Sequence, residues 1–313
     1  MRASPGGRAG AEHPKLFSYL KIAEGCDNHC TYCAIPLIRG GYRSRKMEDI
    51  LAEAEKLAQW GVKELMVIAQ DTTRYGEDLY GEGKLPQLLT ELCKVERLRW
   101  IRVLYCYPER ITGELLEVMA KEDKILKYMD LPLQHCSRQV LRAMNRQGDR
   151  ESLSALIPGK SVRRCLASYC APPLWWASQA KPRRLLRNWR NLPEMRFERM
   201  GCYCLFRRKE LRRQGCRIQS PGNEEHRREL IWSSDGLMDE MSREMVGKTI
   251  TVLNEGWDRY AECCFGRSAA DAPEIDTKVF FTVEGKKPYP GMFVQVEITD
   301  TMDCDLIGQV VTT

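Results

Sequence analysis

Three cysteines in one short loop constrain this chain more than any other feature. Cys26, Cys30 and Cys33 lie in KIAEGCDNHCTYCAIPLIRG with the spacing C-x3-C-x2-C. Thiolates this close can hold three irons of a cubane [4Fe–4S] cluster and leave the fourth iron open to a small molecule. One alternative is a zinc knuckle with His29 as fourth ligand, although structural zinc sites usually pair two C-x2-C halves across a longer spacer. A disulfide is the weaker alternative, because nothing in the sequence points to an oxidising compartment.

The bulk composition indicates a globular protein without a membrane partner. A chain of 313 residues that is 43% hydrophobic makes one large or two ordinary domains. No apolar run is long enough to cross a bilayer, and residues 1–15 lack the apolar segment of a secretory signal, so they are expected to form a disordered tail. The expected setting is the reducing cytoplasm, where 14 cysteines are cluster ligands and ordinary thiols.

The hydrophobic pattern alternates between strand and helix periods. We expect strands at 17–24, 63–69, 99–105 and 127–131, each followed by a helix, at 46–60, 85–95, 112–121 and 137–146. Gly61 is expected to end the first helix and Thr112 to cap the third. Four strand–loop–helix units predict a parallel sheet with right-handed crossovers, and either a doubly wound sheet or a barrel satisfies this pattern. Residues 241–313 contain five short alternating stretches, which predict a small antiparallel β-barrel.

Residues 158–240 fit neither pattern. Within 158–222 there are 16 Lys and Arg against 3 Asp and Glu, so this segment holds all of the chain's positive excess. One interpretation is a basic, aromatic arm that binds single-stranded nucleic acid. We favour a reading-frame error, because charge and binary pattern fail together. Codons exist for residues 176–192 whose shifted frame encodes GFPGETEAAFEELAEF.

The cysteine loop and two later motifs resemble one enzyme family. C-x3-C-x-Y-C is similar to the loop of radical S-adenosylmethionine (SAM) enzymes, and EGCDNHCTYCAIPLIRGGYRSR resembles their methylthiotransferase branch. AQDTTRYGEDL and DLPLQHCSRQVLRAMNR resemble the subfamily that modifies an aspartate of ribosomal protein number twelve of the small subunit. The resemblance covers residues 16–157, 194–203 and 241–313.

This resemblance implies a fold and a reaction. The fold is α/β: an incomplete radical-SAM (βα)6-type barrel, with cofactor loops at the C-terminal ends of its strands, followed by a TRAM-like β-barrel. Cys26, Cys30 and Cys33 would hold the cluster, and its open iron would bind SAM. One electron then cleaves the sulfonium, and the resulting radical abstracts a hydrogen from the aspartate. The implied partners are the ribosomal protein as substrate, an electron donor such as flavodoxin or ferredoxin, and RNA at the C-terminal barrel.

Five further residues are candidates for cofactor binding, and none is assigned as catalytic. Tyr32 would form a wall for the adenine or only shield the cluster edge. Gln70 and Asp71 end the second strand, where they would bond the cofactor's amino group or ribose, or else cap a helix or stiffen the loop. Gln134 and His135 end the fourth strand, with geometry similar to that of Gln70 and Asp71 at the second. His135 would be either a proton carrier or a structural histidine.

Three arginines beside the loop have two interpretations. Arg39, Arg43 and Arg45 would balance the charge of the cluster and the cofactor's carboxylate, or would form an ordinary solvated face.

The sequence departs from the family in two places. The family has an N-terminal domain with three further cysteines for a second [4Fe–4S] cluster, whereas only a short tail precedes Lys15, so ligands for that cluster are expected to be absent. The GFPGE-type motif is also absent as written, so the barrel is expected to lack its last strands and expose an apolar edge. As printed, the chain is expected to be truncated and impaired, binding cofactor poorly and transferring no methylthio group.

Two other functions remain as alternatives. One is methylthiolation of a tRNA adenosine, against which AQDTTRYG and LPLQH argue. The other is a non-catalytic RNA-binding protein that uses the small barrel and the basic segment.

Overall fold

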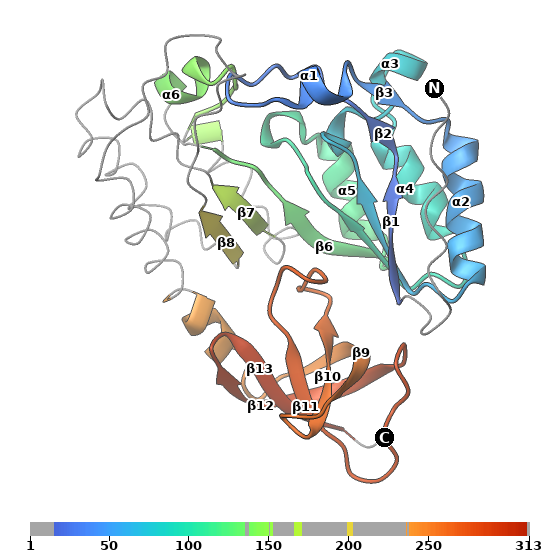
Figure 1. The fold of residues 1–313 in the computed structure, drawn as a ribbon, viewed down its shortest axis with the longest axis vertical. Helices are drawn as coiled ribbons and strands as arrows, with labels where there is room; N and C mark the ends of the chain where they lie inside the picture. The colour runs from blue at the N-terminus through green and yellow to red at the C-terminus, as the bar shows by residue number, and fades with distance from the viewer. Residues whose placement is uncertain are drawn as a thin grey trace.

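A computed structural model of the chain shows two units, an α/β unit followed by an all-β unit (Figure 1). It describes residues 16–134, 138–149, 151–152, 166–170, 199–202, 236 and 238–311. Within these residues a six-stranded sheet is followed by a closed five-stranded barrel. The predicted α/β class and the order of the two units are confirmed.

The first unit is an open, all-parallel sheet. Its strand order is β1-β4-β5-β6-β7-β8, and each neighbouring pair is parallel. The strands are β1 (Phe17–Lys21), β4 (Glu64–Ile68), β5 (Trp100–Val103), β6 (Ile125–Asp130), β7 (Leu166–Cys170) and β8 (Arg199–Cys202). Chain order equals spatial order across the sheet, as expected for an incomplete barrel of βα units.

The expectation that the barrel lacks its last strands is wrong. Strand β7 pairs with β6 through Met129 and Leu166, and β8 extends the sheet beside β7. Both strands fall inside 158–240, which fits no regular pattern, and β8 lies within the stretch 194–203 that resembles the family. Short strands form there because parallel pairing is a main-chain interaction that tolerates an irregular side-chain pattern. Most of 158–240 lies outside the described residues, so its assignment to a frame error stays a prediction.

Amphipathic helices cover one face of the sheet (Figure 1). The main three are α2 (Met47–Gln59), α4 (Leu85–Cys93) and α5 (Gly113–Lys121). Their ends follow the predicted signals: Gly61 has φ 96°, and the Thr112 side chain accepts a hydrogen bond from the Leu115 amide at 3.2 Å. Shorter helices lie at the carboxyl edge of the sheet, namely α1 (Ile35–Arg39), η1 (Thr72–Arg74), α3 (Glu77–Tyr80), η2 (Pro108–Arg110) and α6 (Arg138–Ala143).

The second unit is a closed barrel with the order β10-β11-β13-β12-β9. Its strands are β9 (Thr249–Asp258), β10 (Cys263–Ser268), β11 (Val279–Thr282), β12 (Phe293–Met302) and β13 (Asp305–Val310). Four of the five neighbouring pairs are antiparallel, whereas β11 and β13 are parallel. The predicted antiparallel barrel is therefore correct except at this one seam, where closure brings together two strands that run in the same direction.

A buried ion network joins the two units. Glu64 at the start of β4 accepts hydrogen bonds from Arg102 and from Arg267 of the second unit, each at 2.8 Å. Arg102 also donates to the main-chain oxygen of Asp271 at 2.9 Å. The second unit is thus fixed at the amino-terminal end of the sheet, opposite the edge that carries the cysteine loop. Among the described residues no helix is long and apolar enough to cross a membrane.

Candidate cluster and cofactor site

The cysteine loop begins and ends at a two-stranded ribbon. Strand β2 (Ala23–Glu24) pairs with β3 (Arg43–Ser44), so the expected strand 17–24 is divided at Ile22. The Cys26 amide donates to the carbonyl of Gly40 at 3.1 Å. Gly25 has φ 82°, and a Cβ there would lie 2.1 Å from the Gly41 oxygen. Only glycine fits this position, because both the backbone angle and the close approach exclude a side chain.

Asp71 ties the loop to the end of β4. Its buried carboxylate accepts from the Asn28 side chain at 2.8 Å and from the Thr73 hydroxyl at 2.5 Å, while its main-chain oxygen accepts from the Tyr42 hydroxyl at 2.8 Å. Burial raises the pKa of Asp71, and the hydrogen bonds from Thr73 and Asn28 oppose that rise. The carboxylate is therefore occupied by donors of the chain, which supports the loop-stiffening interpretation of Asp71.

The three cysteines are free thiols on this one loop. Cys26 and Cys30 are buried and Cys33 is half-buried. Burial raises the pKa of Cys26 and Cys33, while the Ile35 amide donates to the Cys33 sulfur at 3.5 Å and favours its thiolate. These soft, sheltered donors with an amide aimed at sulfur fit an iron–sulfur cluster.

A zinc knuckle with His29 finds no support in the described part of the chain. His29 is exposed, and no three His, Cys, Asp or Glu side chains there are arranged around a single ion. A cluster does not need such convergence, because its thiolates bind different irons.

A group of aromatic and charged side chains lies on one side of Cys30. The Tyr107 hydroxyl lies 3.7 Å from the Cys30 sulfur. The Arg146 guanidinium lies 4.2 Å from the centre of the Tyr107 ring, bonds the carboxylate of Glu109 at 2.7 and 2.9 Å, and donates to the Tyr32 hydroxyl at 3.4 Å. We call Tyr32, Tyr107, Glu109 and Arg146 the Cys30 cage. Burial, and then the charge of Cys30, raise the pKa of both tyrosines, which keeps their hydroxyls protonated.

The glutamines lie where the sequence placed them. Gln70 follows β4, and its Oε1 is buried without a hydrogen-bond partner. Gln134 is buried with φ 62° after β6. A non-glycine residue in this left-handed region is uncommon and is often held by a functional constraint. His135 lies outside the described residues, so its role stays a prediction.

The arginines beside the loop bond to groups other than the cysteines. Arg39 lies 3.6 Å from Glu24, and Arg45 lies 2.6 Å from Glu53. Arg43 donates to the main-chain oxygens of Gly41 and Arg39. These contacts support the solvated-face interpretation and give no support to charge balance at the cluster.

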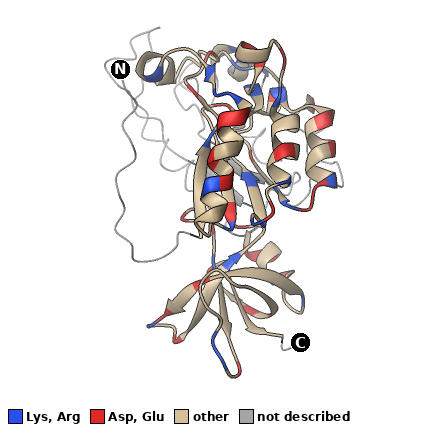
Figure 2. Cartoon of the chain, turned by 90° about the vertical axis from the view of Figure 1, so that its right-hand side faces the viewer, with Lys and Arg blue, Asp and Glu red and all other residues tan. Residues whose placement is uncertain are grey.

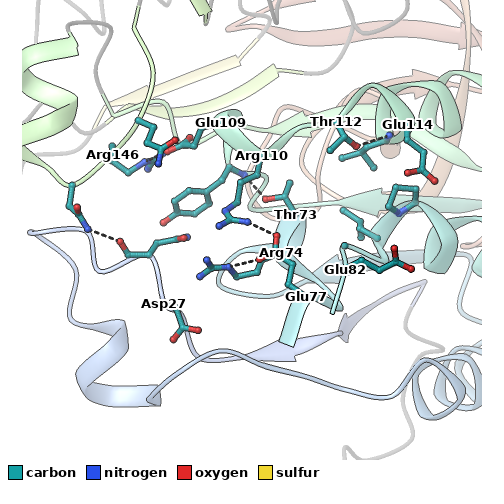
Figure 3. Close-up of a pocket in the computed structure, with 18 of the residues that line it drawn as sticks. Asp27, Thr73, Arg74, Glu77, Glu82, Glu109, Arg110, Thr112, Glu114 and Arg146 are labelled. Atoms are coloured by element: carbon teal, nitrogen blue, oxygen red, sulfur yellow. Dashed lines mark hydrogen bonds and ion pairs between the residues drawn. The ribbon is translucent and has the colours of Figure 1, made fainter. Parts of the chain in front are cut away.

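An open cleft of about 920 Å³ lies beside the cysteine loop (Figure 3). Figure 3 shows Arg74 and Arg110 both directed at Glu77, and Arg146 next to Glu109 on the Arg110 side of the view. The cleft is lined by Asp27 and Asn28 of the loop, by residues after β4 and β5, and by the end of α6. None of the three cysteines lines it, whereas Tyr107 does, so Tyr107 stands between Cys30 and the cleft.

Of the four residues of the Cys30 cage, only Tyr32 was predicted from the sequence. Tyr107 and Glu109 belong to YCYPER, which follows the third parallel strand β5. Loops after the strands of a βα barrel carry its functional groups, so the position of this polar, aromatic segment was the available signal. Arg146 stands at the end of the DLPLQHCSRQVLRAMNR motif and offered no comparable signal.

Two stretches of the chain match known family models. Residues 20–157 match the radical SAM superfamily, and residues 246–311 match the TRAM domain. Over 299 residues the chain is 40% identical to the ribosomal protein uS12 methylthiotransferase RimO of Caldanaerobacter subterraneus subsp. tengcongensis, an alignment that spans 95% of this chain and 67% of that protein. The chain belongs to the RimO family. A RimO relative from Alkaliphilus oremlandii is 40% identical over 303 residues, which span 94% of this chain and 68% of the relative.

Solved structures give a weaker likeness. The radical SAM methyltransferase TsrM from Kitasatospora setae has a TM-score of 0.48 at 13% identity, covering 78% of this chain and 42% of TsrM. Streptococcus suis SuiB also has a TM-score of 0.48 at 13% identity, covering 73% of this chain and 48% of SuiB. Both scores are below 0.5, so the assignment to the RimO family rests on the sequence relatives. Membership of the radical SAM superfamily implies a [4Fe–4S] cluster and SAM as cofactors.

Proposed function

We propose that this chain belongs to an enzyme that adds a methylthio group to the β-carbon of an aspartate in ribosomal protein uS12, in the cytoplasm, and that the chain as printed is impaired in this transfer. The observation that carries the proposal is the loop of three free thiols, which Asp71 and Gly25 shape at the carboxyl edge of a parallel sheet. The loop occurs in a chain whose relatives are named for this reaction.

The proposed roles follow from position and hydrogen bonding. Cys26, Cys30 and Cys33 hold the [4Fe–4S] cluster, which when bound and reduced supplies the electron that cleaves SAM. Gln70 offers a buried, unpartnered oxygen to the cofactor's ammonium group. Tyr32 lies in the loop between Cys30 and Cys33 and belongs to the Cys30 cage, and its aromatic ring would form a wall for the adenine.

Three other candidates act nearby. Asp71 positions the loop through Asn28. Gln134 follows β6 at the same edge of the sheet and would contact the ribose or the carboxylate of SAM, and we propose the same role for His135, the next residue in the sequence. The electron comes from a low-potential carrier such as flavodoxin or ferredoxin. The second [4Fe–4S] cluster stays a prediction, and no residue of the printed sequence is assigned to it.

A deletion strain tests the assignment of the substrate. Mass spectrometry should show that uS12 loses its methylthio group when the gene is deleted and regains it when an intact copy is supplied. Loss of a methylthio group from tRNA, with uS12 unchanged, would contradict the proposal in favour of tRNA adenosine methylthiolation.

The reading frame of the codons for residues 158–240 needs a separate test. We propose that this segment is frame-shifted, as its local excess of Lys and Arg supports. Resequencing the DNA across codons 155–245 should reveal compensating insertions or deletions. DNA that encodes the printed residues would contradict this proposal and leave the proposal for the cysteine loop standing.

The second unit carries an exposed aromatic and basic surface. Tyr260 is fully exposed and Tyr289 is 65% exposed, while the Lys287 ammonium lies 3.0 Å from the centre of the Trp257 ring. Figure 2 shows basic positions on the loop that extends farthest from the first unit. Aromatic rings beside lysines bind single-stranded RNA by stacking and phosphate contact. We propose that this surface contacts ribosomal RNA.

Filter binding tests this surface. Tyr260→Ala should weaken binding to single-stranded RNA, and Lys287→Ala should also reduce the salt dependence of binding, because it removes a phosphate contact. Tyr80→Phe on the first unit is the control. Equal affinity and equal salt dependence in all variants would contradict RNA contact at this surface.

A further inference from the structure

The Cys30 sulfur has a hydrogen-bond partner that lies far away in sequence. Tyr107 comes from the loop after β5, and its hydroxyl is 3.7 Å from the sulfur, within the range of sulfur hydrogen bonds. Either atom can donate when Cys30 is a thiol. Once Cys30 is a metal ligand it is a thiolate without a proton, so only the tyrosine hydroxyl can donate.

The position of Tyr107 is fixed from both sides. The Arg146 guanidinium covers its ring at 4.2 Å, and the Tyr107 amide donates to the Thr73 hydroxyl at 3.4 Å. Arg146 is itself buried. Its guanidinium donates hydrogen bonds to the carboxylate of Glu109 and, at 3.2 Å, to the carbonyl oxygen of Pro132. A bidentate Arg–carboxylate pair is rigid, so it holds the Tyr107 ring that stacks on it in a fixed position beside the sulfur.

We propose that Tyr107 donates a hydrogen bond to the Cys30 thiolate and thereby raises the reduction potential of the bound cluster, with Arg146 and Glu109 as the residues that position it. The inference rests on the proposed function, in which Cys30 holds the cluster. Tyr107 is a tuning residue rather than a catalytic one, because it touches a ligand and not the substrate.

The direction follows from charge. One electron from a low-potential one-electron donor enters the cluster, no proton is transferred, and the cluster with its thiolates becomes more negative by one unit. A hydrogen bond to a ligand sulfur stabilises the more negative state more strongly, so it raises the potential. Cys30 is buried and does not line the cleft, so this hydrogen bond lies in a medium of low dielectric.

The test is a redox titration of the reconstituted full chain, followed by electron paramagnetic resonance. Tyr107→Phe keeps the ring and its stack on Arg146 but removes the hydroxyl. We expect unchanged iron content and a reduction equilibrium constant that is at least threefold smaller. For one electron, at 59 mV per tenfold, this makes the midpoint potential more negative by about 28 mV. Tyr105→Phe is the matched control, because Tyr105 lies in the same loop with a side chain 44% exposed. It should leave the potential unchanged.

A second variant tests the positioning residues. Glu109→Gln loosens the hold on Arg146 and should shift the potential in the same direction as Tyr107→Phe, by a smaller amount. Equal potentials for Tyr107→Phe, Tyr105→Phe and the parent chain would overturn the inference. Loss of iron from Tyr107→Phe would also overturn it, because the hydroxyl would then build the site rather than tune it. A parent chain without iron would instead contradict the proposed function itself.

Discussion

The Glu64 carboxylate and the Arg267 guanidinium meet at 2.8 Å across the boundary between the two units, and both side chains are buried. Arg102 completes the network from the other side of Glu64. Removing one partner of a buried ion pair leaves uncompensated charge, which costs about 3–5 kcal/mol. Glu64→Gln should therefore lower the free energy of unfolding by roughly this amount in urea titrations.

A surface variant controls for the change of charge. Glu96→Gln alters an exposed glutamate of the same unit and should change the free energy of unfolding by less than about 0.5 kcal/mol. If Glu64→Gln were as stable as Glu96→Gln, the network would not hold the two units together.

The shape of the cysteine loop depends on Gly25. Gly25→Ala would place a Cβ 2.1 Å from the Gly41 oxygen at φ 82°, so the loop must move. Gly81→Ala is a matched control, because Gly81 has φ 78° with open space around it and adds only the backbone strain of about 1–2 kcal/mol. We expect Gly25→Ala to lose most of its iron after reconstitution and Gly81→Ala to keep it. Equal iron in both variants would show that the close approach does not shape the site.

Asp130 makes stability depend on pH. Burial raises its pKa from 3.8 to about 7; the Tyr105 amide opposes this rise and the charge of Asp276 adds to it. Between pH 4 and 7 the folded state keeps a proton that the unfolded state releases, so the free energy of unfolding falls as pH rises through that window. At about 1.36 kcal/mol per pKa unit the loss is at most about 4 kcal/mol.

Replacing Asp130 tests this dependence. Asp130→Asn should remove most of the decrease in unfolding free energy between pH 4 and 8, whereas the exposed Asp123→Asn should retain it. A profile for Asp130→Asn that follows the parent chain would assign the pH dependence to another group.

Gln70 and Asp71 are neighbours with different expected roles. Gln70→Ala should weaken SAM binding at least about tenfold without loss of iron, because it removes a hydrogen-bond acceptor for a charged group. Asp71→Ala should lower iron content, because it frees Asn28 of the loop. Calorimetric SAM titration and iron analysis separate the two effects. Reversed results would exchange the two roles.

Local signals predicted the first half of the sheet well. Thr112 caps its helix and Gly61 follows its helix with positive φ, because both effects depend on neighbouring residues only. Cysteine spacing pointed to the loop in the same way. The predicted strand 17–24 is too long, because the chain leaves the sheet at Ile22. The alternation of apolar and polar residues continues through that point and does not indicate the break.

Contacts between distant segments were not predictable. Tyr107 and Arg146 stand 77 and 116 residues from Cys30 in the chain, and only the sheet brings them together. The sequence placed Glu64 in the expected strand 63–69 and gave no sign of its two arginine partners, because these belong to another strand and another unit. Strands β7 and β8 were missed because their segment lacks the period-2 pattern on which strand prediction depends.

Iron, sulfide and SAM cleavage, measured on the same sample, test whether the three-cysteine loop holds a cluster that cleaves SAM. The chain reconstituted anaerobically should bind a [4Fe–4S] cluster and, with a strong reductant, cleave SAM reductively. Cys26→Ser, Cys30→Ser and Cys33→Ser should each lose both properties, while Cys93→Ser, outside the loop, should keep them. A colourless protein with stoichiometric zinc, or loop variants that match the parent chain, would show that the three cysteines do not hold such a cluster.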